Sequence, residues 1–302
     1  MAEWIDLIDP SPEELREKLP REVQESALEL LLAPARHADE PRPTLQAHGD
    51  YIFGVFLVAV PVPEEDRVFY QEIDVVVTHD TLVSVSKTPP NEHPYDPRPA
   101  RESCHPDDEA GMMLYRLVDD IAEHYLDLVD ALDGEIDELE DSVEIASAEV
   151  TRTRLSDLRH DLLHIRRTLS PTRDAVRRIV DNVIEVEKGP EVFPHEVEIA
   201  FNSAYDKLLR AFDGLELSRD LIASVRDYLQ AKIANDQNEV MKTLTVIASL
   251  LLLPTFIVGL YGQNFQHHFP EIHWQFGYLW SWGLIIVTTL GQLWFFRRKR
   301  WI

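Results

Sequence analysis

The chain has 302 residues, enough for one or two domains with hydrophobic cores, and a formal net charge of -25. Because nucleic-acid phosphates bind basic surfaces, this balance argues against a nucleic-acid partner. The acids are unevenly placed: residues 240–302 hold one acid and five bases, whereas the first 239 residues hold 53 acids and 24 bases. An acidic field concentrates cations near a surface, although solubility alone explains the same charge.

Cysteine usage and the first residues bear on the compartment. Cys104 is the only cysteine in the sequence, so neither a disulfide within the chain nor a cysteine-based zinc site is expected. A reducing compartment fits this usage. The segment Met1–Asp6 is acidic and lacks the basic region and apolar core of a signal peptide. We therefore expect the acidic part of the chain to stay in the cytoplasm.

The first 105 residues predict a small α/β domain. A nearly continuous run of apolar residues after position 50 is typical of a buried strand, and two later segments are rich in β-branched residues. Five prolines between Thr88 and Pro99 predict a loop. The predicted helices are Glu13–Lys18 and Glu22–Ala33, and the predicted strands are Tyr51–Val60, Glu72–Thr78 and Leu82–Lys87.

Residues 106–190 predict a pair of helices of opposite charge. Apolar residues recur at three- and four-residue steps from Leu114 to Val143, which is the period of an amphipathic helix. Twelve acids lie between Asp119 and Glu144, and the next helical stretch, Arg152–Arg178, holds eight arginines. Such helices are expected to pair within one chain or between chains. Exposed ion pairs are weak, so we assign these faces first to solubility and docking, with cation sensing as the alternative.

Residues 191–260 predict a stalk helix that continues into a membrane span. Helical periodicity runs from Pro194 without a clear stop, so residues 195–260 would form one helix of about 99 Å. Its last part, Thr243–Leu260, carries no charge and spans about 27 Å as a helix, just long enough for a bilayer core. Membrane helices tolerate an internal proline such as Pro254.

A second uncharged run, Tyr278–Phe296, has aromatic residues crowded at both ends, as in interfacial belts. Lys242 precedes the first span, residues 297–302 form a basic tail, and the connection 261–277 has neither lysine nor arginine. By the positive-inside rule, both termini are cytoplasmic and the connection lies outside. The alternative is a soluble helical hairpin buried in a core.

The first span ends in Tyr261-Gly262-Gln263-Asn264, a glycine followed by two carboxamides. Carboxamide oxygens accept hydrogen bonds from the water shell of an ion, and Mg²⁺ gives up that shell reluctantly. A glycine–asparagine helix cap is the alternative. The loop beyond it contains His267 and His268, which are either solvated or capture a borderline-soft ion such as Zn²⁺, Co²⁺ or Ni²⁺.

The order of these parts resembles the CorA family of magnesium transporters. An acidic soluble region is followed by a long helix with Asn238-Glu239-Val240-Met241, a span with Pro254-Thr255-Phe256, the glycine motif, a second span and a basic tail. The resemblance is detailed over about residues 227–302 and architectural over the first 226. The family signature is Gly-Met-Asn after a tyrosine; here Gln263 replaces the methionine, which bears on ion preference because zinc-transporting relatives also vary there.

The resemblance implies an α+β subunit: a cytoplasmic α/β domain, then a long stalk helix that continues into a two-helix transmembrane hairpin. Five copies would form a funnel-shaped homopentamer in the lipid bilayer, with the first span lining the pore. An Asp227 ring would attract cations at the cytoplasmic mouth. Ser203 stands where the family usually has an acid for regulatory Mg²⁺, so Asp206 or Glu198 would have to substitute. The implied pore-lining residues are Asn238, Met241, Leu244, Ala248, Leu252, Thr255 and Gly259.

The favoured function is channel-like influx of Mg²⁺, with Co²⁺ or Ni²⁺, across the cell (inner or plasma) membrane, driven by the membrane potential. The metal is cargo, and no cofactor is expected. Proton-coupled Zn²⁺ transport and a non-conducting sensor or scaffold are the alternatives. An enzyme is disfavoured, because the sequence lacks a phosphate loop, a nucleophile elbow and a metalloprotease helix. His160 and His164 have metal-binding spacing without the protease glutamate. The predicted divisions are 1–105, 106–190, 191–260, 261–277, 278–296 and 297–302.

Overall fold

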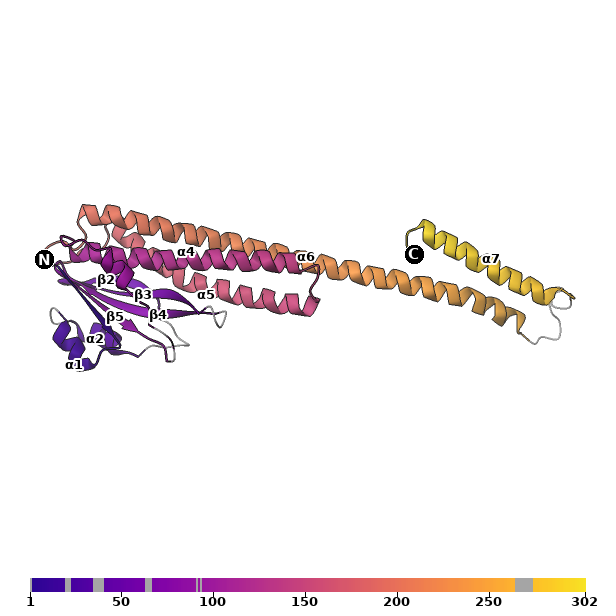
Figure 1. Cartoon of the computed structure of the whole chain (residues 1–302), viewed down its shortest axis with the longest axis horizontal. Helices are drawn as coiled ribbons and strands as arrows, with labels where there is room; N and C mark the ends of the chain where they lie inside the picture. The colour runs from indigo at the N-terminus through magenta and orange to yellow at the C-terminus, as the bar shows by residue number, and fades with distance from the viewer. Residues whose placement is uncertain are drawn as a thin grey trace. The chain divides into compact units, whose positions relative to one another are not determined.

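The computed structural model describes residues 2–19, 23–34, 41–62, 67–90, 92, 94–263 and 274–302 (Figure 1). The chain divides into two compact units, one up to Arg226 and one from Asp227 onward, and each is described by itself. Helix α6 (His195–Tyr261) begins in the first unit and ends in the second.

The first unit contains a five-stranded mixed sheet with the order β1-β5-β4-β3-β2. Its long central strands, β3 and β4, form an antiparallel hairpin in which Ile52 pairs with Val77 and Val62 with Arg67. The edge strand β1 runs parallel to β5, and the other pairs are antiparallel. The strands are β1 (Glu3–Ile8), β2 (Thr44–His48), β3 (Tyr51–Val62), β4 (Arg67–Val77) and β5 (Thr81–Lys87).

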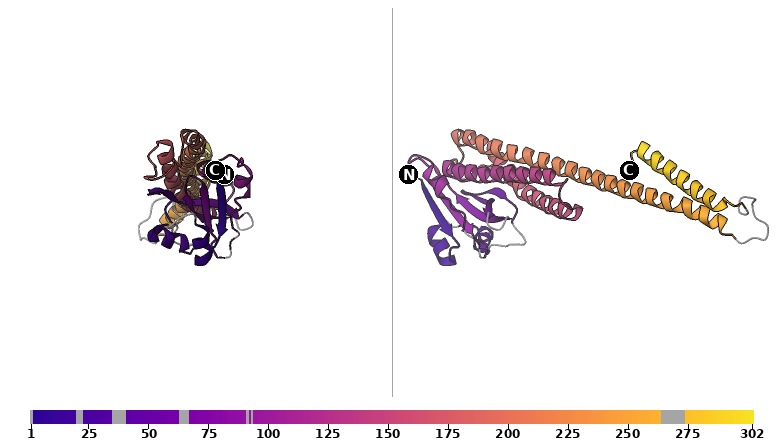
Figure 2. Two further views of the ribbon diagram at one scale, coloured as in Figure 1. Left: turned by 90° about the vertical axis from the view of Figure 1, so that its left-hand side faces the viewer. Right: turned by 45° about the vertical axis from the view of Figure 1, so that its right-hand side comes forward.

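Both faces of the sheet are buried. One face packs against α1 (Pro12–Lys18) and α2 (Glu25–Leu32) through a cluster that includes Leu15, Leu31 and Phe53. Because side chains alternate along a strand, the intervening residues point to the opposite face, which α4 covers. Figures 1 and 2 show the sheet between these two helical layers. Burial on both faces explains why β3 is a nearly continuous apolar run.

Three helices lie side by side over the sheet in the first unit: α4 (Ala110–Ser142), α5 (Ala148–Val180) and the first part of α6 (Figure 1). The Ser147 hydroxyl caps α5 by accepting from the backbone N–H of Val150. The apolar stripe predicted for α4 is buried, as expected from its helical period. The buried residues of that stripe include Leu114, Leu117, Ile121, Tyr125, Leu132, Ile136 and Leu139.

Charged residues of these helices pair mostly through α6. The Lys207 ammonium lies 3.1 Å from Asp119 and 2.7 Å from Glu123 of α4, and Arg166 of α5 lies 3.2 Å from Glu216 of α6. Between α4 and α5 the structure shows a longer contact of 3.9 Å, from Arg154 to Glu138, with both side chains exposed. The acidic helix α4 and the basic helix α5 therefore form ion pairs mainly with α6, and only a longer contact joins them directly.

The structure corrects two predicted boundaries. Helix α2 begins at Glu25 because the backbone N–H of Gln24 donates to the Tyr51 hydroxyl and Gln24 stays outside the helix. The predicted loop extends only to residue 97, since α3 (Arg98–Glu102) starts inside the proline-rich stretch. A proline is tolerated in the first turn of a helix, where no N–H is needed.

Two strands were not predicted. β1 lies at a sheet edge and carries acids among its apolar residues, and β2 has five residues. β1 is held by tertiary contacts: the Trp4 indole donates to the Ser84 hydroxyl at 2.8 Å, and that hydroxyl donates to Asp6 at 2.7 Å. Strand β4 also begins earlier than predicted, at Arg67.

The second unit contains the end of α6 and α7 (Gly277–Arg298), which run alongside each other in opposite directions (Figure 1). Both helices are long and apolar enough to cross a membrane by length and composition. Most of their apolar side chains are exposed within this chain. The two predicted spans thus correspond to helices, and the alternative of a hairpin buried in a soluble core is wrong because little of either helix is buried.

A buried ion cluster lies on the α2 side of the sheet. The Lys87 ammonium pairs with Glu72 and with Asp74, at 2.7 Å from the latter, and donates to the Leu30 carbonyl at 2.6 Å. Lys87 and Asp74 are almost fully buried. Burial raises the pKa of Asp74 to about 8 by disfavouring the charged carboxylate, Lys87 opposes this shift, and Glu72 adds to it.

The Asp74 carboxyl should make the stability of the protein depend on pH. Its pKa is raised on folding, so the folded state binds the proton more tightly, and the resulting stabilisation is complete below the ordinary carboxyl range near pH 4. It should be lost as the pH rises toward about 8. In Asp74→Asn the midpoint of thermal unfolding should vary less with pH over this interval. The exposed change Asp130→Asn is the control, and an unchanged slope in Asp74→Asn would contradict the assignment.

Gly111 allows the start of α4 to pass close to the backbone of Val192. A Cβ at Gly111 would lie 2.1 Å from the Val192 carbonyl oxygen, whereas a Cβ at Gly134 of the same helix would meet nothing within 4 Å. Gly111→Ala should therefore destabilise the protein by about 1–3 kcal/mol. Gly134→Ala should stabilise it by about 0.5–1 kcal/mol through helix propensity. Chemical denaturation in mild detergent measures both, and equal effects would show that the close approach is not tight.

Candidate functional site

The stripe of α6 implied as pore lining is uncovered in the second unit. Met241 and Leu244 are both 58% exposed, and Leu252 is 72% exposed. The remaining stripe residues, Asn238, Ala248, Thr255 and Gly259, are also exposed. All seven positions lie on one side of the helix, because each residue turns about 100° and the steps are three or four.

Helix α7 covers another side of α6. Val246 and Ile257 of α6 are buried, at 5% and 6% exposure. They lie about 120–140° around the helix from Leu252. The Gln292 amide of α7 donates to the Ser249 carbonyl of α6 at 3.1 Å. The hairpin therefore leaves the stripe open for water, lipid or another copy of the chain.

Gln292 was not singled out from the sequence. It is the only carboxamide in the run Tyr278–Phe296, and a lone amide in an apolar span is itself a signal, because lipid offers it no hydrogen-bond partner. In the structure its amide links α7 to the backbone of α6, beside the buried residues Val246 and Ile257.

The polar groups of the stripe keep oxygens available. The Thr255 hydroxyl donates to the Leu251 carbonyl at 2.7 Å. A hydroxyl has two further acceptor sites, so the Thr255 oxygen can still accept a hydrogen bond from water. Asn238 is exposed, and Asp227 lies eleven residues before it on the same side of the helix. The stripe thus presents side-chain oxygens at Asn238 and at Thr255. The apolar side chains of Met241, Leu244 and Leu252 lie between these two positions along the helix.

The glycine motif lies at the C-terminal end of α6. The backbone N–H of Gly262 donates to the Val258 carbonyl at 2.9 Å, and a Cβ at Gly262 would lie 3.1 Å from the same oxygen. Gly262 does not adopt the left-handed conformation that a glycine cap uses, so that feature of the alternative interpretation is absent. Tyr261 ends the helix and Gln263 is exposed. Asn264, His267 and His268 lie outside the described residues.

The weaker metal candidates do not come together within one chain. Glu198 and Asp206 are eight residues apart on α6, which is about 12 Å along the helix axis. Glu198 contacts His195 at 3.3 Å, and Asp206 is exposed. Over the described part of the chain, no three histidine, cysteine or acidic side chains are grouped so that they could hold a metal ion.

The histidine pair of α5 has a structural setting. The rings of His160 and His164 have centroids 6.5 Å apart, and His164 packs on Tyr70 at 4.5 Å. Neither ring is part of a group that could hold a metal among the described residues.

Comparison with known families decides the family of the chain. The family model described as CorA-like Mg²⁺ transporter protein matches residues 2–298. The chain belongs to the CorA family. The likeness in fold extends to nearly the whole chain: the complete CorA magnesium transporter structure from Methanocaldococcus jannaschii superposes with a TM-score of 0.78 at 21% identity, over 99% of this chain and 91% of that one.

Curated relatives carry different ion names. The putative metal ion transporter YfjQ of Bacillus subtilis is 34% identical over 193 residues, 63% of this chain and 58% of that protein. The cobalt/magnesium transport protein CorA of Thermotoga maritima is 31% identical over 193 residues, 64% of this chain and 53% of that protein. The chain therefore spans little more than half the length of these relatives. The zinc transport protein ZntB of Yersinia enterocolitica is 24% identical over 193 residues, 64% of this chain and 57% of that protein.

Proposed function

We propose that this protein carries divalent metal cations across the cell (inner or plasma) membrane and acts as a channel for Mg²⁺, with Co²⁺ or Ni²⁺ as further substrates, rather than as an enzyme. The observation that carries the proposal is the uncovered stripe on α6, opposite the side that α7 covers, in a chain of the CorA family. The metal is the substrate of this process and not a resident cofactor.

The proposed assembly is a homopentamer with α6 around its axis. Two helices of one chain do not enclose a path for an ion, so several copies must surround it. A stripe that is open in one chain can face a path shared by the copies. Both termini would face the cytoplasm, as the basic tail at residues 297–302 favours. The domain divisions predicted from the sequence are retained as part of this proposal.

Each level of the stripe has a physical role in the proposed path. Gln263 and Asn264 would accept hydrogen bonds from the water shell of the arriving ion, which Mg²⁺ keeps more readily than it loses. Leu244 and Leu252 would close the path by excluding water, and Thr255 and Asn238 would offer oxygens to a hydrated ion. For a divalent ion, 100 mV of inside-negative potential favours entry by about 4.6 kcal/mol. A ring of Asp227 would attract cations at the cytoplasmic end.

Proton-coupled Zn²⁺ transport is the second candidate. Two observations favour it: Gln263 stands where the family signature has methionine, and His267 and His268 lie in the following loop. Imidazole suits Zn²⁺ better than Mg²⁺. The similarity to ZntB supports the same candidate. A non-conducting sensor or scaffold is the outcome if no ion crosses.

The stripe proposal predicts water access at Thr255. In a Cys104→Ser background, Thr255→Cys in proteoliposomes should react with a charged, water-soluble thiol reagent, because it faces the path. Ile257→Cys, two residues away at nearly the same depth, should stay unreactive, because Ile257 is 6% exposed beside α7. Labelling followed by mass measurement distinguishes the two. Equal labelling, or labelling of Ile257→Cys alone, would place the path elsewhere.

The ion is tested by flux into proteoliposomes that contain ion-sensitive dyes. Mg²⁺ and Zn²⁺ are offered separately, each with and without a pH gradient and an imposed potential, and empty liposomes are the control. We expect Mg²⁺ entry that increases with inside-negative potential and ignores the pH gradient, since the driving force acts on the charge of the ion. Gln263→Met, which restores the family signature, tests whether this position alters the preference.

Zn²⁺ entry that requires the pH gradient would select the second candidate. Flux of neither ion, from protein whose pentameric size has been verified in mild detergent, would reject the channel and leave the non-conducting alternative. A monomer in the same detergent would count directly against the proposed assembly.

A further inference from the structure

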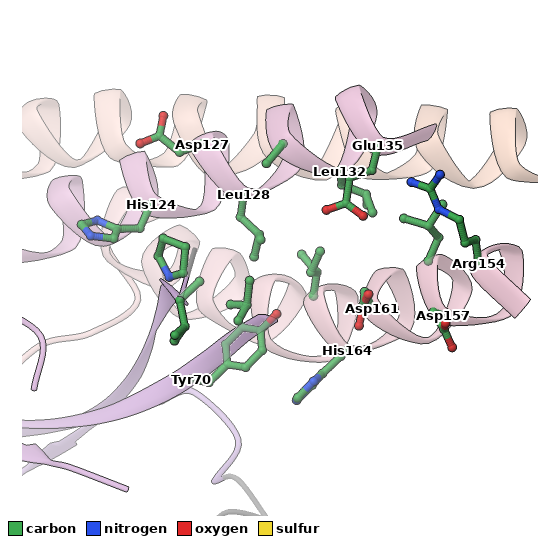
Figure 3. A pocket seen from close by; sticks show the side chains of 17 residues that line it. Tyr70, His124, Asp127, Leu128, Leu132, Glu135, Arg154, Asp157, Asp161 and His164 are labelled. Atoms are coloured by element: carbon green, nitrogen blue, oxygen red, sulfur yellow. The ribbon is translucent and has the colours of Figure 1, made fainter. Parts of the chain in front are cut away.

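A cleft of about 700 Å³ opens in the first unit, between α4, α5 and the ends of β3 and β4 (Figure 3). Helix α4 contributes residues from His124 to Glu135, and α5 contributes residues from Arg154 to Ile165. The strands contribute residues from the end of β3 and the beginning of β4. None of the stripe residues of α6 lines it, so the cleft is separate from the proposed ion path.

The floor of the cleft is apolar. Leu128 and Leu132 of α4 point toward α5 in Figure 3, and the Tyr70 ring closes the strand side. Two further wall residues, Ala131 of α4 and Val62 of β3, are not fully buried and leave apolar surface open. Leu158 and Ile165 of α5 complete the apolar lining.

The charges along the rim are mainly negative and widely spaced. Asp127 and Glu135 of α4 are eight residues apart, about 12 Å along the axis, and Asp157 and Asp161 of α5 are four apart, about 6 Å. Among the described residues that line the cleft, Arg154 is the only lysine or arginine, and it lies at one end beside Asp157 and Glu135 (Figure 3). Asp127 and Asp157 are exposed to solvent.

This arrangement discriminates between ligand classes. A compact metal ion requires several oxygens around one point, and no such group of three exists among the described residues. An anion would meet four carboxylates against one guanidinium. An elongated cation with separated charges and an aliphatic body matches both the spaced carboxylates and the apolar floor, because methylene groups gain from burial while ammonium groups gain from charge-assisted hydrogen bonds.

We propose that this cleft binds a linear aliphatic polyamine, with its methylene chain along the Leu128–Leu132 floor and its ammonium groups on the carboxylates of α4 and α5. The ligand would bridge the two helices and hold them at one separation. The site is independent of the proposed transport function, since binding can be measured on the full chain without any ion flux.

Spermidine is the probe. Its binding to the full chain in mild detergent is measured by titration calorimetry at constant ionic strength. We expect saturable one-to-one binding per chain. Asp127→Asn combined with Asp157→Asn should raise the Kd about tenfold or more, because two charge-assisted hydrogen bonds are weakened. The matched control, Asp130→Asn combined with Asp141→Asn, removes two exposed α4 charges that do not line the cleft and should leave the Kd within about twofold.

A second variant tests the cavity rather than its charge. Ala131→Trp places a large side chain in the cleft and keeps every carboxylate, so it should abolish spermidine binding while the unfolding midpoint stays close to that of the natural chain. Equal weakening by both pairs of charge removals, with no effect of Ala131→Trp, would overturn the proposal and show general attraction of a polycation to an acidic surface. Absence of spermidine binding to the natural chain would also overturn it.

Discussion

The membrane hairpin cannot bury its own apolar surface, and this constraint governs how the rest of the protein is used. In the most apolar windows of α6 and α7, only 11% and 6% of the residues are buried within the chain. Apolar surface left in water costs about 25 cal/mol per Å². Lipid, or other copies of the chain, must therefore cover these helices. The Gln292–Ser249 hydrogen bond joins α7 to a side of α6 other than the open stripe.

The first unit differs from the hairpin, because its apolar side chains are largely buried within the chain. The sheet is covered on both faces, and α4 buries its apolar stripe against the sheet and α5. What remains outside is largely acidic, and among the described residues the acids are spread along helices instead of converging on one point. The exception is the Lys87 cluster, where the carboxyl groups of Glu72 and Asp74 share one ammonium inside the protein. Removing the Lys87 ammonium would leave these carboxyl groups without a cation in a buried site, which typically costs about 3–5 kcal/mol.

Long periodic elements could be predicted from the sequence, and elements held by distant contacts could not. The stripe from Leu114 to Val143 predicts α4, and the apolar run after Tyr51 predicts β3. Both signals, a helical period and a continuous apolar run, can be recognised from neighbouring residues alone. β1 mixes acids with apolar residues and depends on Ser84 for its place, so no local pattern identifies it. The close approach of Gly111 to Val192 joins segments about 80 residues apart, and only the folded chain reveals it.

The candidate site also has features that the sequence predicts and features that only the structure shows. The steps of three and four along α6 already predict one stripe, because helix geometry alone decides which residues share a side. That the stripe is open depends on where α7 packs, and the sequence does not show this packing; the hydrogen bond that joins α7 to α6 comes from Gln292 and is seen in the structure. The cleft between α4 and α5 has no sequence signature, since its floor combines residues that serve as ordinary core positions of two helices and a hairpin.

In the proposed path, the exchange of methionine for Gln263 would act on ion selection through the orientation of water. A hydrated cation presents water hydrogens outward, so the entrance must offer acceptors. A thioether is a weak acceptor, whereas a glutamine offers a carbonyl oxygen together with two N–H donors. The donors must point away from the ion, and the neighbouring chain groups decide whether they can. In the proposed path, selection at this entrance would depend on how firmly an ion holds its water, and Mg²⁺ holds its water more firmly than the ions that accept imidazole in its place.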